Sequence, residues 1–135
     1  MTNIQNFEKW GVDMEKAKKK LVGVPLINIR NKIAMDLMKY ITDRTPVDTG
    51  RAKANTHASA GSPSFAIFDF VDTIGGATIA AAAQIILDST NPYEKIFIQN
   101  NLPYIRRLEH GWSAQARDPD GMFGLAVAQV EAEFS

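Results

Sequence analysis

The residues of this chain that could do chemistry are few, and they do not converge on one site. His57 and His110 are the two histidines, and no cysteine is present to complete a metal site. Neither histidine lies in a paired ligand spacing such as His-Glu-x-x-His. We therefore interpret His57 as a polar residue of a strand and His110 as a cation at the end of a helix.

A nucleophilic or phosphate-binding site is not supported either. Glu109, His110 and Ser113 are close in sequence, but a catalytic triad needs a spatial arrangement that adjacency does not supply. No Gly-x-Ser-x-Gly elbow is present. The glycines match neither the Gly-x-Gly-x-x-Gly motif nor the Walker motif.

The paired carboxylates also have a simpler explanation. Asp69/Asp72 and Asp118/Asp120 lie in turn-rich segments, where aspartate caps backbone amides. A glycosidase or a metal site would need converging partners that the sequence does not provide. The sequence therefore predicts no enzyme, no metal and no cofactor.

Composition predicts one ordinary globular domain. The chain has 135 residues, with 15 basic and 15 acidic side chains and a net charge of zero. This balance argues against bulk attraction to nucleic acid or to an anionic membrane, although a local basic patch stays open. The longest apolar run, Ile79–Ala83, is far too short to span a bilayer. Residues 1–20 carry too much charge for a signal peptide.

Two helices are predicted in the first third of the chain. Apolar residues recur at three- and four-residue spacing over residues 3–22, and Gly23 is expected to end that helix. Pro25 suits the first residue of a second helix, which must end before Pro46. Arg30 and Lys32 lie off the apolar stripe of this second helix, which consists of Leu26, Ile29, Ile33, Leu37 and Tyr40.

A turn and a strand are predicted next. Residues 46–50, Pro-Val-Asp-Thr-Gly, have the composition of a turn in which Gly50 takes a positive φ. From Arg51 to Ala60 alanines alternate with polar residues, which predicts a strand with one small buried face and one polar, basic face. The small face would let a helix pack close to the sheet.

The rest of the chain continues this mixed pattern. Residues 61–76 are predicted as a loop or a hairpin, because apolar residues there are interrupted by Asp and Gly. The later elements expected are a helix over Ala77–Leu87, a strand over Lys95–Gln99, a short helix over Pro103–His110 with Asn101 as its N-cap, and a C-terminal helix carrying Phe123, Val127, Val130 and Phe134. This order predicts a single α+β domain over residues 1–135. A small, mostly antiparallel sheet packs against N-terminal, middle and C-terminal helices.

Two segments resemble a known family. Residues 45–55 are Thr-Pro-Val-Asp-Thr-Gly-Arg-Ala-Lys-Ala-Asn, and residues 98–116 include Asn-Asn-Leu-Pro-Tyr and Glu-x-Gly-x-Ser-x-Gln-Ala. Together they resemble the neck and tail-completion family of long-tailed bacteriophages, roughly from residue 25 to residue 134. In that family Gln-Ala is usually followed closely by Pro-x-Gly-Met. Here Arg117-Asp118 is inserted before that motif, which puts the local loop shape in question.

The resemblance implies a structural virion protein, made in the host cytoplasm. Such a protein completes or terminates the tail and joins it to the head, typically as a ring, for which six subunits are one expectation. Its partners would be further copies of itself, the head connector or stopper, and the tail tube. We hypothesise that the contacts involve Arg51, Lys53, Tyr104, Arg107, Glu109 and Trp112. The basic strand face could instead line a channel and touch passing DNA.

A function of another class stays open. The basic helix end Lys16–Lys20 and the face carrying Arg51 and Lys53 could bind phosphates as a small nucleic-acid-binding module. Self-association without DNA would favour the assembly hypothesis, whereas a linear fall of DNA affinity with salt would favour the binding module. No membrane partner is expected.

Overall fold

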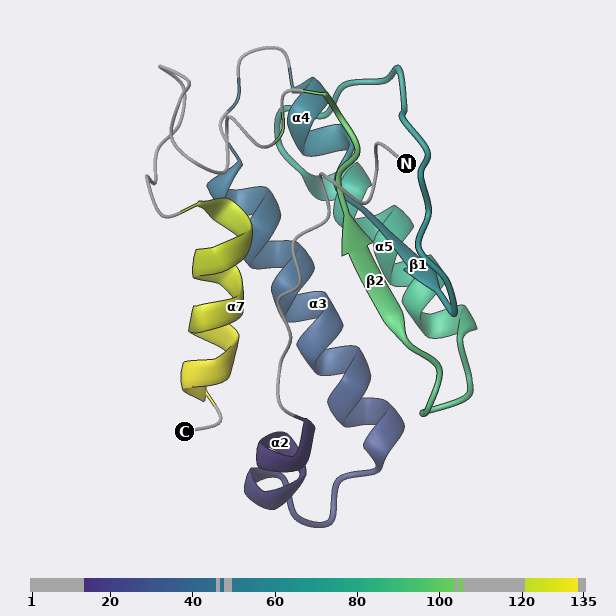
Figure 1. The fold of residues 1–135 in the computed structure, drawn as a ribbon, viewed down its shortest axis with the longest axis vertical. Coiled ribbons are helices and arrows are strands. Elements are labelled where there is room, and N and C mark those ends of the chain that lie inside the picture. The colour runs from purple at the N-terminus through teal and green to yellow at the C-terminus, as the bar shows by residue number, and fades with distance from the viewer. Residues whose placement is uncertain (1–13, 46, 48–49, 104, 106–120, 134–135) are drawn as a thin grey trace.

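The fold is a mixed arrangement of helices around a small sheet. The computed structural model describes residues 14–45, 47, 50–103, 105 and 121–133 (Figure 1). The strands pair antiparallel, with His57 opposite Gln99 and Ala60 opposite Ile96. The predicted α+β class is confirmed. In chain order the elements are α2 (Met14–Lys20), α3 (Leu26–Arg44), α4 (Arg51–Ala54), β1 (His57–Ala60), α5 (Gly76–Asp88), β2 (Ile96–Gln99) and α7 (Met122–Glu133).

Helix α3 lies at the centre and is buried on two sides. Figure 1 shows it between α7 on one side and α5 with the sheet on the other. On the first side, Ile29 and Ile33 pack with Ala17 of α2 and Val130 of α7. The Tyr40 hydroxyl donates a hydrogen bond to the Glu133 carboxylate, and this bond raises the pKa of the tyrosine. The stripe predicted from the sequence is therefore only one of the two buried faces of α3.

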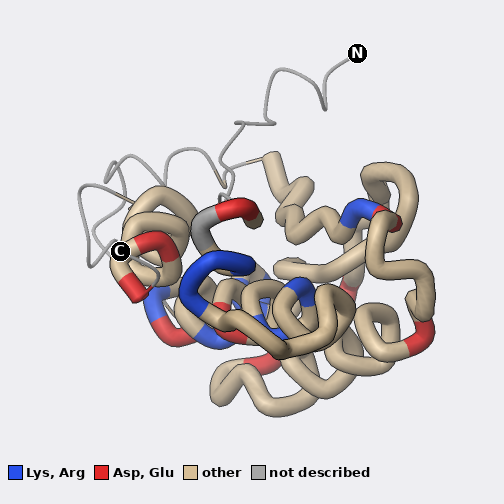
Figure 2. The backbone as a smooth tube through the Cα atoms, turned by 90° about the horizontal axis from the view of Figure 1, so that it is seen from below, with Lys and Arg blue, Asp and Glu red and all other residues tan. Residues whose placement is uncertain are grey.

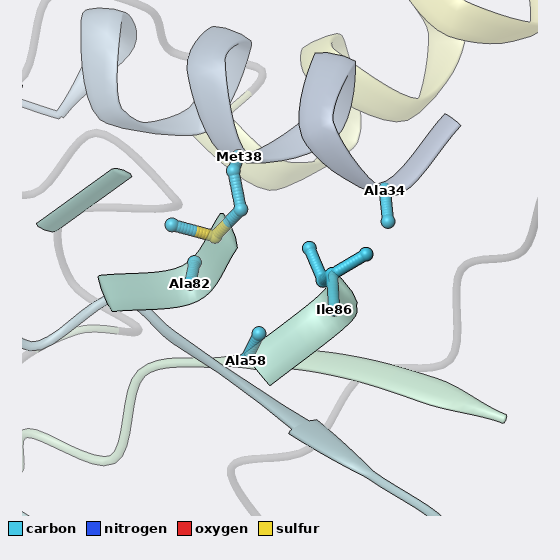
Figure 3. Packing of buried hydrophobic residues seen from close by; sticks show 5 residues of the cluster. All are labelled: Ala34, Met38, Ala58, Ala82 and Ile86. Carbon is cyan, nitrogen blue, oxygen red and sulfur yellow. The ribbon is translucent and has the colours of Figure 1, made fainter. Parts of the chain in front are cut away.

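The second buried side of α3 is lined by small residues. Ala34 and Met38 of α3 point toward Ala82 and Ile86 of α5 and toward Ala58 of β1 (Figure 3). The alanines have almost no side chain to separate the backbones, so two helices and a strand can approach closely. The predicted small face of the strand is confirmed at Ala58, which is buried.

Arg30 is a buried cation that joins α3 to the end of α5. Its side chain is 8% exposed. Nη2 donates to the carbonyl of Ser89 at 2.7 Å, and Nη1 donates to the carbonyl of Asn91 at 2.7 Å. Burial lowers the pKa of the guanidinium, and the nearby Glu94 carboxylate opposes that change. Because five N–H donors project from one planar group, a single side chain fixes the whole turn after α5.

The predicted strand over Arg51–Ala60 is wrong for its first half. Arg51–Ala54 form α4, and β1 begins only at His57. Arginine, alanine and lysine are strong helix formers, and alanine and lysine are weak strand formers, so local preference outweighed the alternating pattern. The Asn55 side-chain amide donates to the Arg51 carbonyl at 2.9 Å and closes the end of the short helix. No continuous basic strand face is formed over residues 51–60.

Most of the other predicted elements are confirmed. The helix ending before Pro46, the helix near Ala77–Leu87 and the strand near Lys95–Gln99 correspond to α3, α5 and β2. Residues 61–75 form no strand and are a loop. The predicted helix over residues 3–22 is described only from Met14, and the predicted helix over Pro103–His110 lies largely outside the described residues.

The C-terminal helix is present, but another set of its residues faces the core. Met122, Ala126 and Val130 are buried in α7, whereas Phe123 and Val127 are half-buried. Phe134 lies outside the described residues. Val130 is buried as predicted, but in the preceding turns the buried residues are Met122 and Ala126, one position before Phe123 and Val127, because alanine fits where α7 meets α3.

Replacing Arg30 by methionine should strongly destabilise the fold. Methionine keeps an unbranched stem but donates no hydrogen bonds, which leaves the buried carbonyl and hydroxyl oxygens of Ser89 without this donor. Each unsatisfied buried group costs about 1–3 kcal/mol, so we expect a loss of about 2–5 kcal/mol in the free energy of unfolding. Urea denaturation measures this loss. Lys32→Met is the matched control, because Lys32 makes only a surface ion pair with Asp36. Equal losses in both variants would contradict the assigned role of Arg30.

Enlarging Ala82 should also destabilise the protein. Leucine at this buried position would push α5 away from α3 and β1, and overpacking of this kind costs about 1–3 kcal/mol. The matched control is Ala80→Leu, which makes the same change at an exposed position of α5. Thermal unfolding of both variants tests the packing. An Ala82→Leu protein as stable as the Ala80→Leu protein would show that the helices are not in close contact there.

Candidate interface around the 61–75 loop

The structure describes two of the six predicted contact residues. Arg51, at the start of α4, is half-buried, and its Nη2 lies 3.9 Å from Oδ1 of Asp69. Lys53 is only 6% exposed, and its aliphatic stem lies against Gly75. Lys53 is therefore not available on the surface of the subunit. The remaining predicted residues lie outside the described part of the chain: Tyr104, Arg107, Glu109 and Trp112.

Basic residues do gather at the end of α2. Lys18, Lys19 and Lys20 are exposed and appear as a continuous blue run in Figure 2. Lys18 lies 3.6 Å from Glu15, and the Lys20 ammonium donates a hydrogen bond to the Glu133 carbonyl. This group is partly neutralised within the fold.

The 61–75 loop is fixed by side-chain amides instead of by a neighbouring strand. The Asn55 amide accepts a hydrogen bond from the Phe68 N–H at 2.7 Å and donates one to the Phe68 carbonyl at 3.0 Å. Gln99 Oε1 accepts from the Ser64 N–H at 2.8 Å, and Asn101 Nδ2 donates to the Ser64 carbonyl at 2.8 Å. All three amide residues are buried. Because its backbone groups are satisfied in this way, the loop keeps a defined path across the sheet without being a strand.

The far end of the loop is held by a carboxylate. Asp72 Oδ1 accepts from the Gly75 N–H at 2.8 Å, and Oδ2 accepts from the Thr78 N–H at 2.9 Å and from the Thr78 hydroxyl at 2.8 Å. The Gly75 N–H contributes most to lowering the pKa of Asp72, which burial partly opposes. The capping role expected from the sequence is confirmed for Asp72. Its neighbour Asp69 is fully exposed at 102% of its side chain.

Gly50 is the point where the predicted turn meets the loop. It has a φ of 85°, and its carbonyl accepts the Asp72 N–H at 3.0 Å. A Cβ atom at this position would lie 2.9 Å from the backbone nitrogen of Thr73. Only glycine combines this φ with so close an approach. The predicted positive φ at Gly50 is confirmed, and it serves to seat the loop.

The anchored loop exposes large apolar side chains to solvent. Their exposed fractions run from 45% for Phe65 to 86% for Ile74. Exposed apolar groups gathered on one segment mark sites of protein contact, whereas isolated ones are common on any surface. We call this set the apolar loop surface; it consists of Phe65, Ile67, Phe70, Val71 and Ile74.

A groove lies next to the apolar loop surface. It has a volume of about 710 Å³ and is bordered by β1, α5 and the loop. Residues 56–60 line it without interruption, together with Phe68 and Phe70 of the loop and Ala81 and Ile85 of α5. We call it the β1 groove. Phe70 belongs both to its wall and to the exposed surface, so the two features are continuous.

His57 is built into the wall of this groove as a structural residue. Its Nδ1 lies 2.9 Å from the Asn55 carbonyl, and its ring meets the Phe68 ring edge to face with centroids 5.3 Å apart. Nε2 is buried and has no hydrogen-bond partner among the described residues. These contacts support the interpretation of His57 as a polar strand residue that packs the loop onto the sheet.

Comparison with known proteins gives no assignment. No family model, no curated protein and no solved structure matches this chain. In the part of the chain that the structure describes, His, Asp and Glu form no group of three or more that could hold a metal ion. None of the described helices has both the length and the apolar character needed to cross a membrane.

Neither the apolar loop surface nor the residues that hold it were predicted from the sequence. A pattern did exist, because Phe65, Ile67, Phe70 and Val71 are concentrated in a segment that no helix or strand pattern accounted for. Asn55 and Gln99 could not be recognised as anchors, because their partners are 13 and 35 residues away along the chain.

Asp72→Asn should lower stability at neutral pH by about 1 kcal/mol, as loss of a capping group does. The pKa of Asp72 in the folded protein is below its ordinary value. The carboxylate therefore stabilises the fold above the unfolded-state pKa of about 3.9, and this contribution is lost as pH falls through the lower folded-state pKa. Urea denaturation at pH 7 and at pH 3 should show the difference between wild type and variant shrinking at the lower pH.

The control for this prediction is Asp69→Asn. The Asp69 carboxylate is fully exposed and its ion pair with Arg51 is long, so its removal should change stability little at either pH. A loss at pH 7 that is the same for both variants, or a gap for Asp72→Asn that does not change with pH, would rule out the capping role.

Proposed function

We propose that this protein is a structural subunit of the neck of a long-tailed bacteriophage. It completes or terminates the tail and joins it to the head, and it assembles with further copies of itself into a ring. The first support is the resemblance of residues 45–55 and 98–116 to the neck and tail-completion family.

The observation that carries the proposal is that both motif segments hold the same loop. The first segment supplies Gly50 and Asn55, and the second supplies Gln99 and Asn101. These residues do not meet in a catalytic arrangement. Each of them fixes the backbone of the 61–75 loop, whose apolar side chains remain exposed. A loop held in this way can present a shaped apolar surface to another protein.

Ring formation needs two different surfaces of the chain that meet at a fixed angle. In this proposal the apolar loop surface is one of them. The second is the segment with Tyr104, Arg107, Glu109 and Trp112, because aromatic residues and arginine are enriched at protein interfaces. Arg51 borders the loop through Asp69 and belongs to the first surface. The ring would contact the head connector or stopper and the tail tube, and DNA would pass through its channel.

Nucleic-acid binding is less well supported than assembly. Lys53 is buried, and the basic strand face on which it was placed is not formed. The lysines at the end of α2 remain exposed, but two of them already contact Glu15 and the Glu133 carbonyl. The geometry of the loop, in contrast, favours a protein partner.

Placing carboxylates on the apolar loop surface should prevent assembly. We expect wild type to form ring-sized particles in light scattering across a concentration series. The double variant Ile67→Asp/Val71→Asp should associate at least about 100-fold more weakly, since each buried aliphatic side chain contributes about 1.5–3 kcal/mol. Both residues are about half exposed, so the subunit itself should remain folded.

The matched control is Val22→Asp/Tyr93→Asp, which adds the same charges at exposed apolar residues outside the loop. It should assemble like wild type. The loop variant, the control variant and wild type are then each added to an extract of infected cells that lacks this protein. Joined heads and tails are counted by electron microscopy. Efficient joining by the loop variant would refute the proposal, as would a wild-type protein that neither forms rings nor restores joining.

A further inference from the structure

In the part of the chain that the structure describes, β1 pairs only with β2, and its outer edge has no partner strand. The Gly61 N–H donates to the Lys95 carbonyl at 2.8 Å, which continues the register in which Ser59 lies opposite Phe97. In an antiparallel pair, hydrogen-bonded positions alternate with positions whose N–H and C=O groups point away from the partner strand. Ala58 and Ala60 are therefore the residues whose backbone groups point away from β2. No hydrogen bond satisfies these groups among the described residues.

The β1 groove runs along this unpaired edge. Its floor is the uninterrupted stretch 56–60, and it is bordered by α5 on one side and by the loop on the other. In Figure 1 both α5 and the loop border β1. The walls are mainly apolar, with Ala81 and Ile85 on α5 and Phe68 and Phe70 on the loop. The groove thus combines free backbone groups with apolar walls, which are the two requirements for adding a strand to a sheet.

The charges in the groove favour an occupant with a positive side chain. Asp88 and Glu94 are its acidic residues, and no lysine or arginine of the described ranges lines it. Glu94 lies beside the end of β1, since a Cβ on Gly61 would be 3.3 Å from its Oε2. A segment that lies along β1 and carries a positive side chain near the Ala60 end would therefore place it close to Glu94.

We propose that the β1 groove accepts an extended segment of a partner polypeptide as a third strand of the sheet. Its backbone pairs with Ala58 and Ala60, its alternate apolar side chains contact the walls, and a lysine or arginine lies near Asp88 and Glu94. A second copy of this chain fits less well through its described residues, because the exposed segment 65–71 carries Asp69 and no cation. The inference does not depend on the proposed neck function.

Synthetic peptides test this inference directly. The probes are two short peptides of alternating threonine and valine, one with a lysine at its N-terminus and the other at its C-terminus, because the strand direction is open. Binding is followed by nuclear magnetic resonance together with amide hydrogen exchange. We expect one of the two peptides to bind and to slow exchange at Ala58 and Ala60 but not at Ser59, whose N–H already faces β2. Replacing the lysine by glutamate should weaken binding several-fold.

Two tryptophan substitutions on α5 test whether the peptide occupies the groove. Ala81→Trp places a large side chain in the groove from an exposed position of α5 and should weaken peptide binding by about tenfold or more, corresponding to at least 1.4 kcal/mol. Ala80→Trp makes the same change at an exposed position that does not line the groove, and should bind like wild type.

Three results would overturn the inference. The first is that wild type binds neither peptide at millimolar concentration. The second is that the Ala81→Trp and Ala80→Trp proteins bind equally well. The third is that a peptide with the sequence of residues 65–71 binds more strongly than both probes. The last result would assign the groove to a second copy of the chain. Peptide binding is measured by nuclear magnetic resonance and ring formation by light scattering, so the two can fail independently of each other.

Discussion

The arrangement of this molecule depends on one buried guanidinium. Arg30 lies within α3, yet its hydrogen bonds go to the turn after α5, with Ser89 and Asn91 as acceptors. Helix α5 in turn packs its alanines against α3 and β1, forms one wall of the groove and offers its first N–H groups to Asp72. A single cation, desolvated but provided with several acceptors, therefore sets the position of the helix on which the core, the groove and one end of the loop all depend.

A second principle of the fold is that amide side chains make the hydrogen bonds to the loop backbone that a neighbouring strand would otherwise make. The 61–75 loop crosses the sheet without pairing to it, and Asn55, Gln99 and Asn101 satisfy its backbone groups. A loop held by its backbone does not need to bury its side chains to stay in place. This is why Phe65 and Ile67 can remain about half exposed on a segment with a defined path.

The sequence predicted what is local and missed what is distant. Helical spacing located α3 and α7, the turn composition located Gly50, and Asp72 was correctly expected to cap backbone amides. The alternating pattern did not indicate a strand correctly at residues 51–54, because alanine alternates there with arginine and lysine, and no β-branched or aromatic residue favours a strand. Arg30 was set aside as a charge off the apolar stripe. Its partners lie 59 and 61 residues further along the chain, and spacing within one helix carries no information about them.

The order of elements also has a consequence for how the chain folds. Residues 57–60 of β1 pair with residues 96–99 of β2, so the sheet closes a long stretch of chain that contains both the loop and α5. Closing so long a stretch has a high entropic cost, which delays non-local strand pairing relative to helix formation. The amides of Gln99 and Asn101 reach the loop only after that closure. Until then the loop is an unanchored apolar segment, and the newly synthesised chain passes through a stage in which it is prone to aggregate before its fold is complete.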